Sequence, residues 1–200
     1  MGCVENKKDL RKKFLKIRTD LSDSFRQSAD VAICNFLEKM LIEKDVKNIC
    51  AFISDGKEPS LNDFIKIIIK NNIELLLPRY NSNSKCYDIC RLKNYPDDLI
   101  MGKYNILEPN FQSEIINSSE VEMWLVPGVI FDKSGGRMGR GKGIYDRLLS
   151  NSKGEKIGIY YECQKVTKVP MERHDSFLET IVTENGIVGV HDLSCVEKSL

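Results

Sequence analysis

Histidine is scarce in this sequence, with only His174 and His191 among 200 residues. A metal centre built from several imidazoles is therefore excluded. The sequence also lacks an excess of charge, because 30 basic and 29 acidic residues leave a formal net charge of +1. General nucleic-acid binding depends on a basic field across a domain, so we expect no nucleic-acid partner. Binding of a small anion by a local cluster of cations stays open.

Long apolar runs and paired cysteines are missing as well. No run approaches the roughly 20 residues that span a bilayer, and the N-terminal segment is charged rather than signal-like. The seven cysteines are scattered, and Cys86 and Cys90 lack the spacing of a zinc knuckle or a redox pair. Most lie in apolar surroundings, which favours buried, reduced thiols. The sequence therefore predicts a cytoplasmic protein with no membrane partner, which we expect to be a monomer.

The common nucleotide-binding and catalytic motifs are absent. A Walker A loop places Ser or Thr after its Gly-Lys pair, but here Gly143 follows Lys142. The alternation of Gly139, Gly141 and Gly143 does not match the Rossmann spacing. No spacing indicates a Ser-His-Asp or Cys-His arrangement. Chemistry that needs no protein nucleophile, such as phosphoryl transfer by positioning and charge stabilisation, fits this absence.

What is present is a glycine-rich segment, residues 135–147, which reads Gly-Gly-Arg-Met-Gly-Arg-Gly-Lys-Gly-Ile-Tyr-Asp-Arg. Its cations are Arg137, Arg140, Lys142 and Arg147. Glycines let a backbone approach a ligand closely and expose its N–H groups. Apolar residues precede the segment and a helical pattern begins at its end, so the order is strand, loop and helix N-terminus. This arrangement is typical of a phosphate site.

The apolar periodicity predicts alternating strands and helices. Helices are expected over residues 7–21, 24–41, 61–70 and 144–149, and strands over residues 49–53, 73–77, 86–92, 121–126, 156–161, 179–183 and 187–190. Residues 86–92 are a weaker, alternating segment, whereas continuous apolar strands elsewhere are typical of a parallel sheet covered on both faces. We therefore predict an α/β fold, with residues 1–200 forming a single three-layer domain around a mainly parallel sheet.

Several local details are predicted with these elements. Val31 is expected on the buried face of the second helix, together with Cys34, Leu37 and Leu41. Ser60 is the expected N-cap of the third helix, with Asp63 at its third position. Pro78 is expected to end the second strand, and residues 94–110 are expected to form a loop.

Polar residues follow the predicted strands at the edge where ligands bind in such sheets. Ser54 to Glu58 follow the first strand, and Pro78-Arg79-Tyr80 follow the second. Asp146 and Asp175 are candidate Mg²⁺ ligands, because Mg²⁺ bridges nucleotide phosphates through one or two carboxylates. Asp146 has a second interpretation, that of an acid in the first turn of a helix, stabilised by the macrodipole. The neighbouring cations favour the functional one.

The segment from Val126-Pro127-Gly128 through Phe131-Asp132 to the glycine-rich segment resembles the 5-formyltetrahydrofolate cyclo-ligase family. The family pattern has Pro-Gly, then Phe-Asp, then a glycine loop that ends in Tyr-Tyr-Asp. Further matches occur in order along almost the whole chain: Lys7-x-x-Leu10-Arg11, Ser54 to Glu58, Leu77-Pro78-Arg79-Tyr80, Ile106-Leu107-Glu108-Pro109, Val169-Pro170 through His174-Asp175, and Val182-Thr183-Glu184.

The resemblance implies a Rossmann-like enzyme that uses MgATP to convert 5-formyltetrahydrofolate to 5,10-methenyltetrahydrofolate, with release of ADP and phosphate. It implies ATP contacts for Lys7, Arg11, Arg137, Met138, Gly139, Arg140, Gly141, Lys142, Gly143, Ile144 and Tyr145. It implies folate contacts for Ile53, Glu58, Tyr80, Arg140, Gly141, Lys142, Gly143 and Ile144. Arg140 and Lys142 are the implied catalytic cations, and Asp146 and Asp175 the implied Mg²⁺ ligands.

One position departs from the family pattern, since Ile144 stands where the first of two tyrosines is usual. An aliphatic side chain neither donates a hydrogen bond nor presents an aromatic face, so we expect the folate pocket to differ there. Two alternatives to an active cyclo-ligase remain: a non-catalytic folate- or nucleotide-binding paralogue, and an unrelated ATP-dependent phosphotransferase.

Overall fold

The computed structural model describes residues 6–172 and 175–190 of the chain. The helices are α1 (Lys7–Thr19), α2 (Asp23–Ile42), α3 (Asn62–Lys70) and α4 (Ile144–Leu149), with 3-10 turns η1 (Lys103–Asn105), η2 (Ser118–Glu120) and η3 (Glu162–Gln164). The strands are β1 (Asn48–Cys50), β2 (Glu74–Asn81), β3 (Cys86–Leu92), β4 (Leu99–Met101), β5 (Leu107–Pro109), β6 (Ile115–Ile116), β7 (Met123–Pro127), β8 (Ile130–Phe131), β9 (Arg137–Met138), β10 (Glu155–Ile159), β11 (Thr180–Thr183) and β12 (Gly186–Gly189).

A central sheet of eight strands runs in the order β12-β11-β10-β7-β1-β2-β3-β6. The strands from β11 to β2 pair in parallel, and the strands at both edges pair antiparallel. The chain leaves β1 to form β2 on one side and later returns to form β7 on the other. Ligands bind in α/β sheets at the carboxyl ends of strands where the winding reverses in this way. The ends of β1 and β7 are therefore the expected place for a site.

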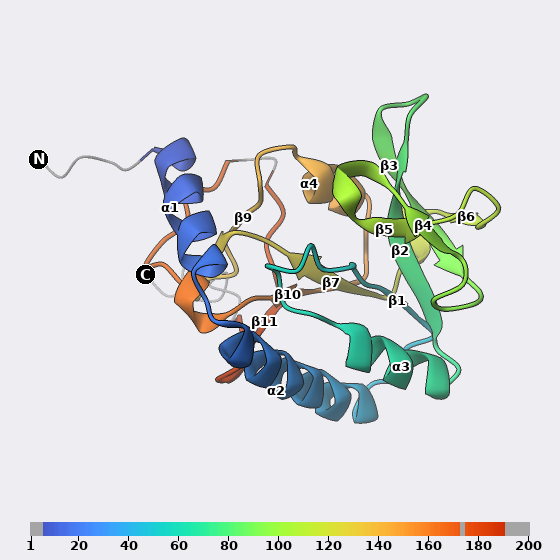
Figure 1. Cartoon of the computed structure of the whole chain (residues 1–200), viewed down its shortest axis with the longest axis horizontal. Helices are drawn as coiled ribbons and strands as arrows, with labels where there is room; N and C mark the ends of the chain where they lie inside the picture. The colour runs from blue at the N-terminus through green and yellow to red at the C-terminus, as the bar shows by residue number, and fades with distance from the viewer. Residues whose placement is uncertain (1–5, 173–174, 191–200) are drawn as a thin grey trace, which may run out of the picture.

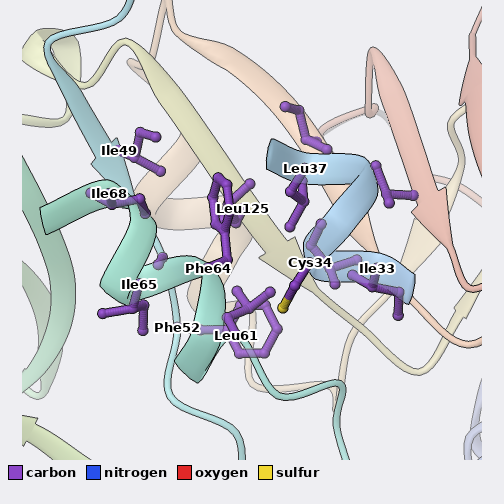
Figure 2. Packing of buried hydrophobic residues seen from close by; sticks show 14 of the residues in the cluster. Ile33, Cys34, Leu37, Ile49, Phe52, Leu61, Phe64, Ile65, Ile68 and Leu125 are labelled. Atoms are coloured by element: carbon purple, nitrogen blue, oxygen red, sulfur yellow. The ribbon is translucent and has the colours of Figure 1, made fainter. Parts of the chain in front are cut away.

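Helices cover both faces of the sheet, as Figure 1 shows, with α2 and α3 on one face and α4 on the other. Figure 2 shows the core between the sheet and the α2–α3 face, where Phe64 lies among side chains from both helices and from the sheet. Within β1 and β7, alternate residues serve opposite faces: Ile49 and Leu125 face α2 and α3, whereas Trp124 joins the cluster under α4. The predicted three-layer α/β fold with a mainly parallel sheet is confirmed.

β2 does not end at Pro78, so that prediction is wrong. The strand continues to Asn81, and Pro78 pairs with Ile89 of β3. The Leu76 carbonyl accepts the Ala51 N–H on the β1 side at 2.9 Å. Pro78 is two residues on, so its nitrogen points to that same side, but β1 has already ended there. A missing N–H is harmless where no neighbouring strand requires it.

Three further local predictions need correction. Cys34, Leu37 and Leu41 are buried as expected, but Val31 is 52% exposed, because the buried face of α2 also takes in Ala29 and Ile33 and leaves Val31 outside it. Leu61, not Ser60, is the N-cap of α3, and no side-chain cap bond forms there because a leucine side chain carries no hydrogen-bond acceptor. Residues 94–110 are not simply a loop, since they contain the antiparallel pair β4–β5.

A short hairpin of β8 and β9 precedes the centre of the glycine-rich segment. Asp132 closes its turn, because Oδ1 accepts the N–H groups of Ser134 at 2.8 Å and Gly136 at 3.0 Å. The hairpin packs against α1 through Phe14, Ile130 and Met138, and Figure 1 shows α1 standing beside β9 at one end of the sheet. The sequence missed this hairpin, which brings α1 and the glycine-rich segment together.

Two predictions from the sequence, one on membrane-spanning segments and one on the cysteines, can be compared with the described residues. Within residues 6–172 and 175–190, no helix has the length and apolar character needed to cross a membrane. The five cysteines in this part of the chain are free thiols: Cys34, Cys50, Cys86, Cys90 and Cys163.

Candidate active site

A cleft of about 390 Å³ opens where the winding of the sheet reverses. Phe52 and Ile53 follow β1, Leu77 and Pro78 lie in β2, and Pro127 ends β7. The remaining walls come from α1, the glycine-rich segment and the region around β5. The sequence-predicted site residues in the lining are Lys7, Arg11, Ile53, Glu58, residues 137–146 and Asp175. Segments far apart in the sequence thus meet in one cavity.

Tyr80 is the one predicted site residue that is not part of this lining. Its ring packs edge-on against Tyr87, with ring centroids 5.4 Å apart, and the ammonium of Lys103 lies 3.3 Å from the Tyr80 centroid. Tyr87, its cross-strand partner, and Tyr104 line the cleft instead. A contact between Tyr80 and a folate ring stays a prediction.

Four charged side chains form a cluster on one side of the cleft: Arg18, Asp55, Glu58 and Arg140. Arg18 is only 1% exposed, and it donates to the Gly128 carbonyl at 3.0 Å and to Glu58 Oε1 at 3.5 Å. Arg140 donates to the same Glu58 oxygen at 3.1 Å and also to Asp55 Oδ2. Both arginines therefore hold Oε1, and no hydrogen bond to a described residue uses Glu58 Oε2. That oxygen is left for a ligand.

Burial and charge act in opposite directions in this cluster. Burial raises the pKa of Glu58 above its usual 4.5, although Arg140 and Arg18 oppose the shift. For Asp55, burial also favours the neutral acid, but the hydrogen bond from Arg140 and those from the backbone outweigh it and lower its pKa. Asp55 is therefore firmly ionised, whereas Glu58 is the carboxylate of the cluster that takes up a proton first on acidification.

The glycine-rich segment divides its cations between buried and free positions. Arg137 is 5% exposed and donates to Asp146 Oδ1 at 2.5 Å, which joins β9 to the first turn of α4. Lys142 is exposed, lines the cleft and forms no ion pair with any described residue. Two cations of α1 approach the same region: Arg11 donates to the Gly139 carbonyl at 3.0 Å, and Lys7 lies 3.4 Å from Asp175. Lys142 and Arg11 therefore line the cleft without a described carboxylate partner, which suits them to a polyanion.

The two predicted metal ligands, Asp146 and Asp175, both line the cleft. Asp146 accepts from Arg137 through Oδ1, and no hydrogen bond from a described residue uses its second oxygen. The described residues contain no cluster of three or more side chains of the types that ligate metals. The donor set fits Mg²⁺ as it occurs in nucleotide sites, where one or two carboxylates share the ion with phosphates and water.

Sequence reasoning missed Arg18 and most of the apolar wall of the cleft, and it placed Asp55 at the ligand-binding edge without giving it a role. Arg18 had a visible signal, since it lies four residues after Phe14 and three before Leu21, on the apolar face of its helix. A charge on such a face needs a partner. The missed lining residues are Phe52, Leu77, Pro78, Tyr87, Tyr104, Ile106, Leu107, Glu108, Pro127, Gly128 and Pro170. They come from several separate elements, and no local pattern brings them together.

Comparison with known proteins gives one consistent family. A model of the 5-formyltetrahydrofolate cyclo-ligase family matches residues 3–184. The chain is 27% identical over 177 residues to a 5-formyltetrahydrofolate cyclo-ligase of Haemophilus influenzae, which covers 86% of this chain and 94% of that protein. It is 28% identical over 150 residues to the cyclo-ligase of Mus musculus, which covers 70% of this chain and 74% of that protein.

Solved structures agree with this result. The NMR structure of Aquifex aeolicus 5,10-methenyltetrahydrofolate synthetase has a TM-score of 0.82 and 32% identity, and the match covers 92% of this chain and 93% of that one. A synthetase of the same name from Mycoplasma pneumoniae has a TM-score of 0.72 and 25% identity, covering 90% and 99%. These matches confirm the resemblance seen in the sequence. The chain belongs to the 5-formyltetrahydrofolate cyclo-ligase family.

Proposed function

We propose that the cleft converts 5-formyltetrahydrofolate to 5,10-methenyltetrahydrofolate with ATP as cosubstrate. The observation that carries this proposal is that one cavity contains both a cation that pairs with no described carboxylate and a carboxylate oxygen that accepts no hydrogen bond from a described residue. Lys142 supplies the cation, and Glu58 Oε2 supplies the acceptor. Family membership sets aside the alternative of an unrelated phosphotransferase.

The reaction needs activation of an oxygen rather than a protein nucleophile. Transfer of the γ-phosphoryl group to the formyl oxygen breaks the bond to ADP and makes that oxygen a good leaving group. N10 then attacks the formyl carbon and loses its proton, the ring closes, and the oxygen departs as inorganic phosphate. Alignment of the two substrates supplies much of the rate, and fixed cations stabilise the charge as it moves.

Different residues of the site would bind ATP, the folate and Mg²⁺. ATP would contact Lys7, Arg11 and residues 137–145, with Lys142 placed for the phosphates and Arg140 for charge near the transferred group. The folate would contact Ile53, Glu58 and residues 140–144 of the cleft, and also Tyr80, which lies outside the cleft lining. Asp146 and Asp175 would hold Mg²⁺, which when bound neutralises phosphate charge. The metal, a monomeric state and a cytoplasmic location are predictions that belong to this proposal.

The test is incubation of the purified chain with 5-formyltetrahydrofolate and MgATP while the absorbance of the methenyl product is followed. We expect product only when both substrates and Mg²⁺ are present, with one phosphate released per ring closed. The control omits ATP. Folate binding without product formation would contradict the proposal and favour the non-catalytic paralogue.

A further inference from the structure

The centre of the glycine-rich segment has little backbone support of its own. We call residues 139–143 the cation loop, because they carry Arg140 and Lys142 between three glycines. Its one hydrogen bond between described backbone groups is at the end of the loop, where the Gly143 carbonyl accepts the Arg147 N–H at 3.2 Å. Gly141 and Gly143 have φ values of +86° and +61°, a region that glycine enters freely. The loop is therefore held mainly by side chains.

Side chains from three places hold this loop. Arg11 of α1 donates to the Gly139 carbonyl, as described above, and Arg147 Nη2 donates to the Lys142 carbonyl at 3.0 Å. The third anchor is the side chain of Arg140, which crosses to the loop after β1 and donates to Asp55 and Glu58. Only this third anchor joins the cation loop to the side of the cleft that carries Glu58.

Asp55 serves both partners with separate oxygens. Oδ1 accepts the N–H groups of Lys57 at 2.9 Å and Glu58 at 3.0 Å, which fixes the turn that carries Glu58. Oδ2 accepts Arg140 and lies 4.0 Å from Arg18. Asp55 is not part of the cleft lining, so it reaches a ligand only through its neighbours.

We propose that Asp55 is a positioning residue for the reaction. Its Oδ2 fixes Arg140, and with it the cation loop, over the cleft, while its Oδ1 sets the turn that presents Glu58. The kinetic consequence rests on the proposed function, but the anchoring of the loop does not.

Asp55→Asn separates the two oxygens of the side chain. The amide oxygen still accepts from the backbone and keeps the turn, whereas the amide NH₂ cannot accept from Arg140. Asp63→Asn is the matched control, because Asp63 pairs with Lys66 on the surface and both side chains are about two-thirds exposed. Such exposed pairs contribute little to stability.

The first readout is limited trypsin digestion of the full chain, with cleavage after Lys142 followed by mass spectrometry. Loss of a charge-assisted bond makes loop opening more frequent, so we expect cleavage about tenfold faster in Asp55→Asn. Cleavage after the exposed Lys133, in the turn closed by Asp132, is the internal reference. Its rate should not change, and Asp63→Asn should cleave as the wild type does. Equal cleavage after Lys142 in Asp55→Asn and wild type would overturn the proposal.

The second readout is a double-mutant cycle on turnover. We expect Asp55→Asn to lower kcat about tenfold while the urea midpoint stays near that of the wild type, because misplaced groups slow a reaction that depends on alignment. In an Arg140→Gln background the same substitution should lower kcat no further, since the anchored partner is gone. An equal decrease in both backgrounds would show that Asp55 acts without Arg140. If the wild type itself has no turnover, the proposed function fails, and the trypsin result still decides the anchoring.

Discussion

Lys142 and Arg11 are cations of the cleft whose charge no described carboxylate neutralises, but the Arg11 Nε already donates to the Gly139 carbonyl. The neighbours of Lys142 in the glycine-rich segment are already paired, Arg137 with Asp146 and Arg140 with Asp55 and Glu58. A lysine ammonium on a glycine loop is suited to phosphate oxygens when its N–H groups are not already used in an ion pair with a protein carboxylate. We therefore expect Lys142 to have the largest role in charge stabilisation.

We expect Lys142→Ala to reduce kcat by about 10²- to 10³-fold, the loss typical of one removed charge-stabilising donor. Its unfolding in urea should match that of the wild type, because the side chain is exposed and pairs with no described carboxylate. Steady-state kinetics with MgATP check the first expectation, and Lys133→Ala, also exposed, serves as the control. A Lys142→Ala enzyme with near-normal kcat would exclude the assigned role.

Burial raises the pKa of Glu58, and this shift predicts how folate binding depends on pH. On acidification Glu58 becomes protonated at a pH above its usual pKa of 4.5. The protonated side chain then no longer offers an ionised carboxylate to the folate. We expect affinity for the folate to fall on that acid limb, and Glu58→Gln to bind weakly without showing the limb. Binding measured across the pH range checks this. If the affinity of Glu58→Gln still falls on acidification, the group responsible is instead Glu108, another acid of the cleft whose pKa is raised by burial.

The same shift affects stability with a definite sign. The folded state holds the Glu58 proton more tightly than the unfolded state does, so this group stabilises the fold below its unfolded pKa. That contribution is lost as the pH rises through the raised pKa. The free energy of unfolding of the wild type, compared with Glu58→Gln, should therefore decline across that window.

At the scale of elements, the β8–β9 hairpin sets the position of the glycine-rich segment. Gly135 in its turn has φ +80°, and a Cβ there would lie 2.3 Å from the Leu178 carbonyl oxygen. The Leu178 N–H in turn donates to the Gly135 carbonyl at 2.9 Å. The turn is thus locked against the segment before β11.

We expect Gly135→Ala to lower the free energy of unfolding by about 2–4 kcal/mol, because it adds both backbone strain and a clash with the main chain. Gly139→Ala is the matched control, since a Cβ at Gly139 has no neighbour within 4 Å. Its free energy of unfolding should stay within about 0.5 kcal/mol of the wild type. Urea denaturation measures both, and equal stabilities would contradict the close approach of the turn to the segment before β11.

The elements also show what the sequence could predict. The run of β7 is apolar throughout and that of β11 has the apolar centre Ile181-Val182, so their pattern alone identified buried strands. The β8–β9 and β4–β5 pairs have strands of only two or three residues, and Arg137 is buried inside one of them. Such short strands carry no period, and their pairing depends on partners brought by the rest of the fold. The apolar wall of the cleft likewise depends on partners brought together by the fold. The glycine-rich segment, in contrast, could be recognised from its own glycines and cations.

At the scale of the whole molecule, the reversal of winding at β1 explains why distant motifs form one site. The loop after β1 brings Glu58, β7 leads into the glycine-rich segment, and α1 adds Lys7 and Arg11 from the N-terminal part of the chain. Three clusters of buried side chains connect these parts, one on each face of the sheet and one between α1 and the hairpin. A ligand bound in the cleft would therefore contact parts of the chain that are packed into every layer of the fold.

Because the cleft draws on all layers, a ligand bound there should stabilise the chain as one unit. At a ligand concentration of 100 times Kd, we expect MgATP to raise the free energy of unfolding by about 2.7 kcal/mol. For a chain of this length that corresponds to a rise in Tm of about 5–10 °C. Calorimetry should show one transition, with and without ligand, as the sequence predicts for a single domain. The Lys142→Ala chain should show a smaller rise at the same concentration, because its ATP site lacks the free cation. Two transitions, of which only one moves with MgATP, would instead show that the N-terminal and glycine-rich parts unfold separately.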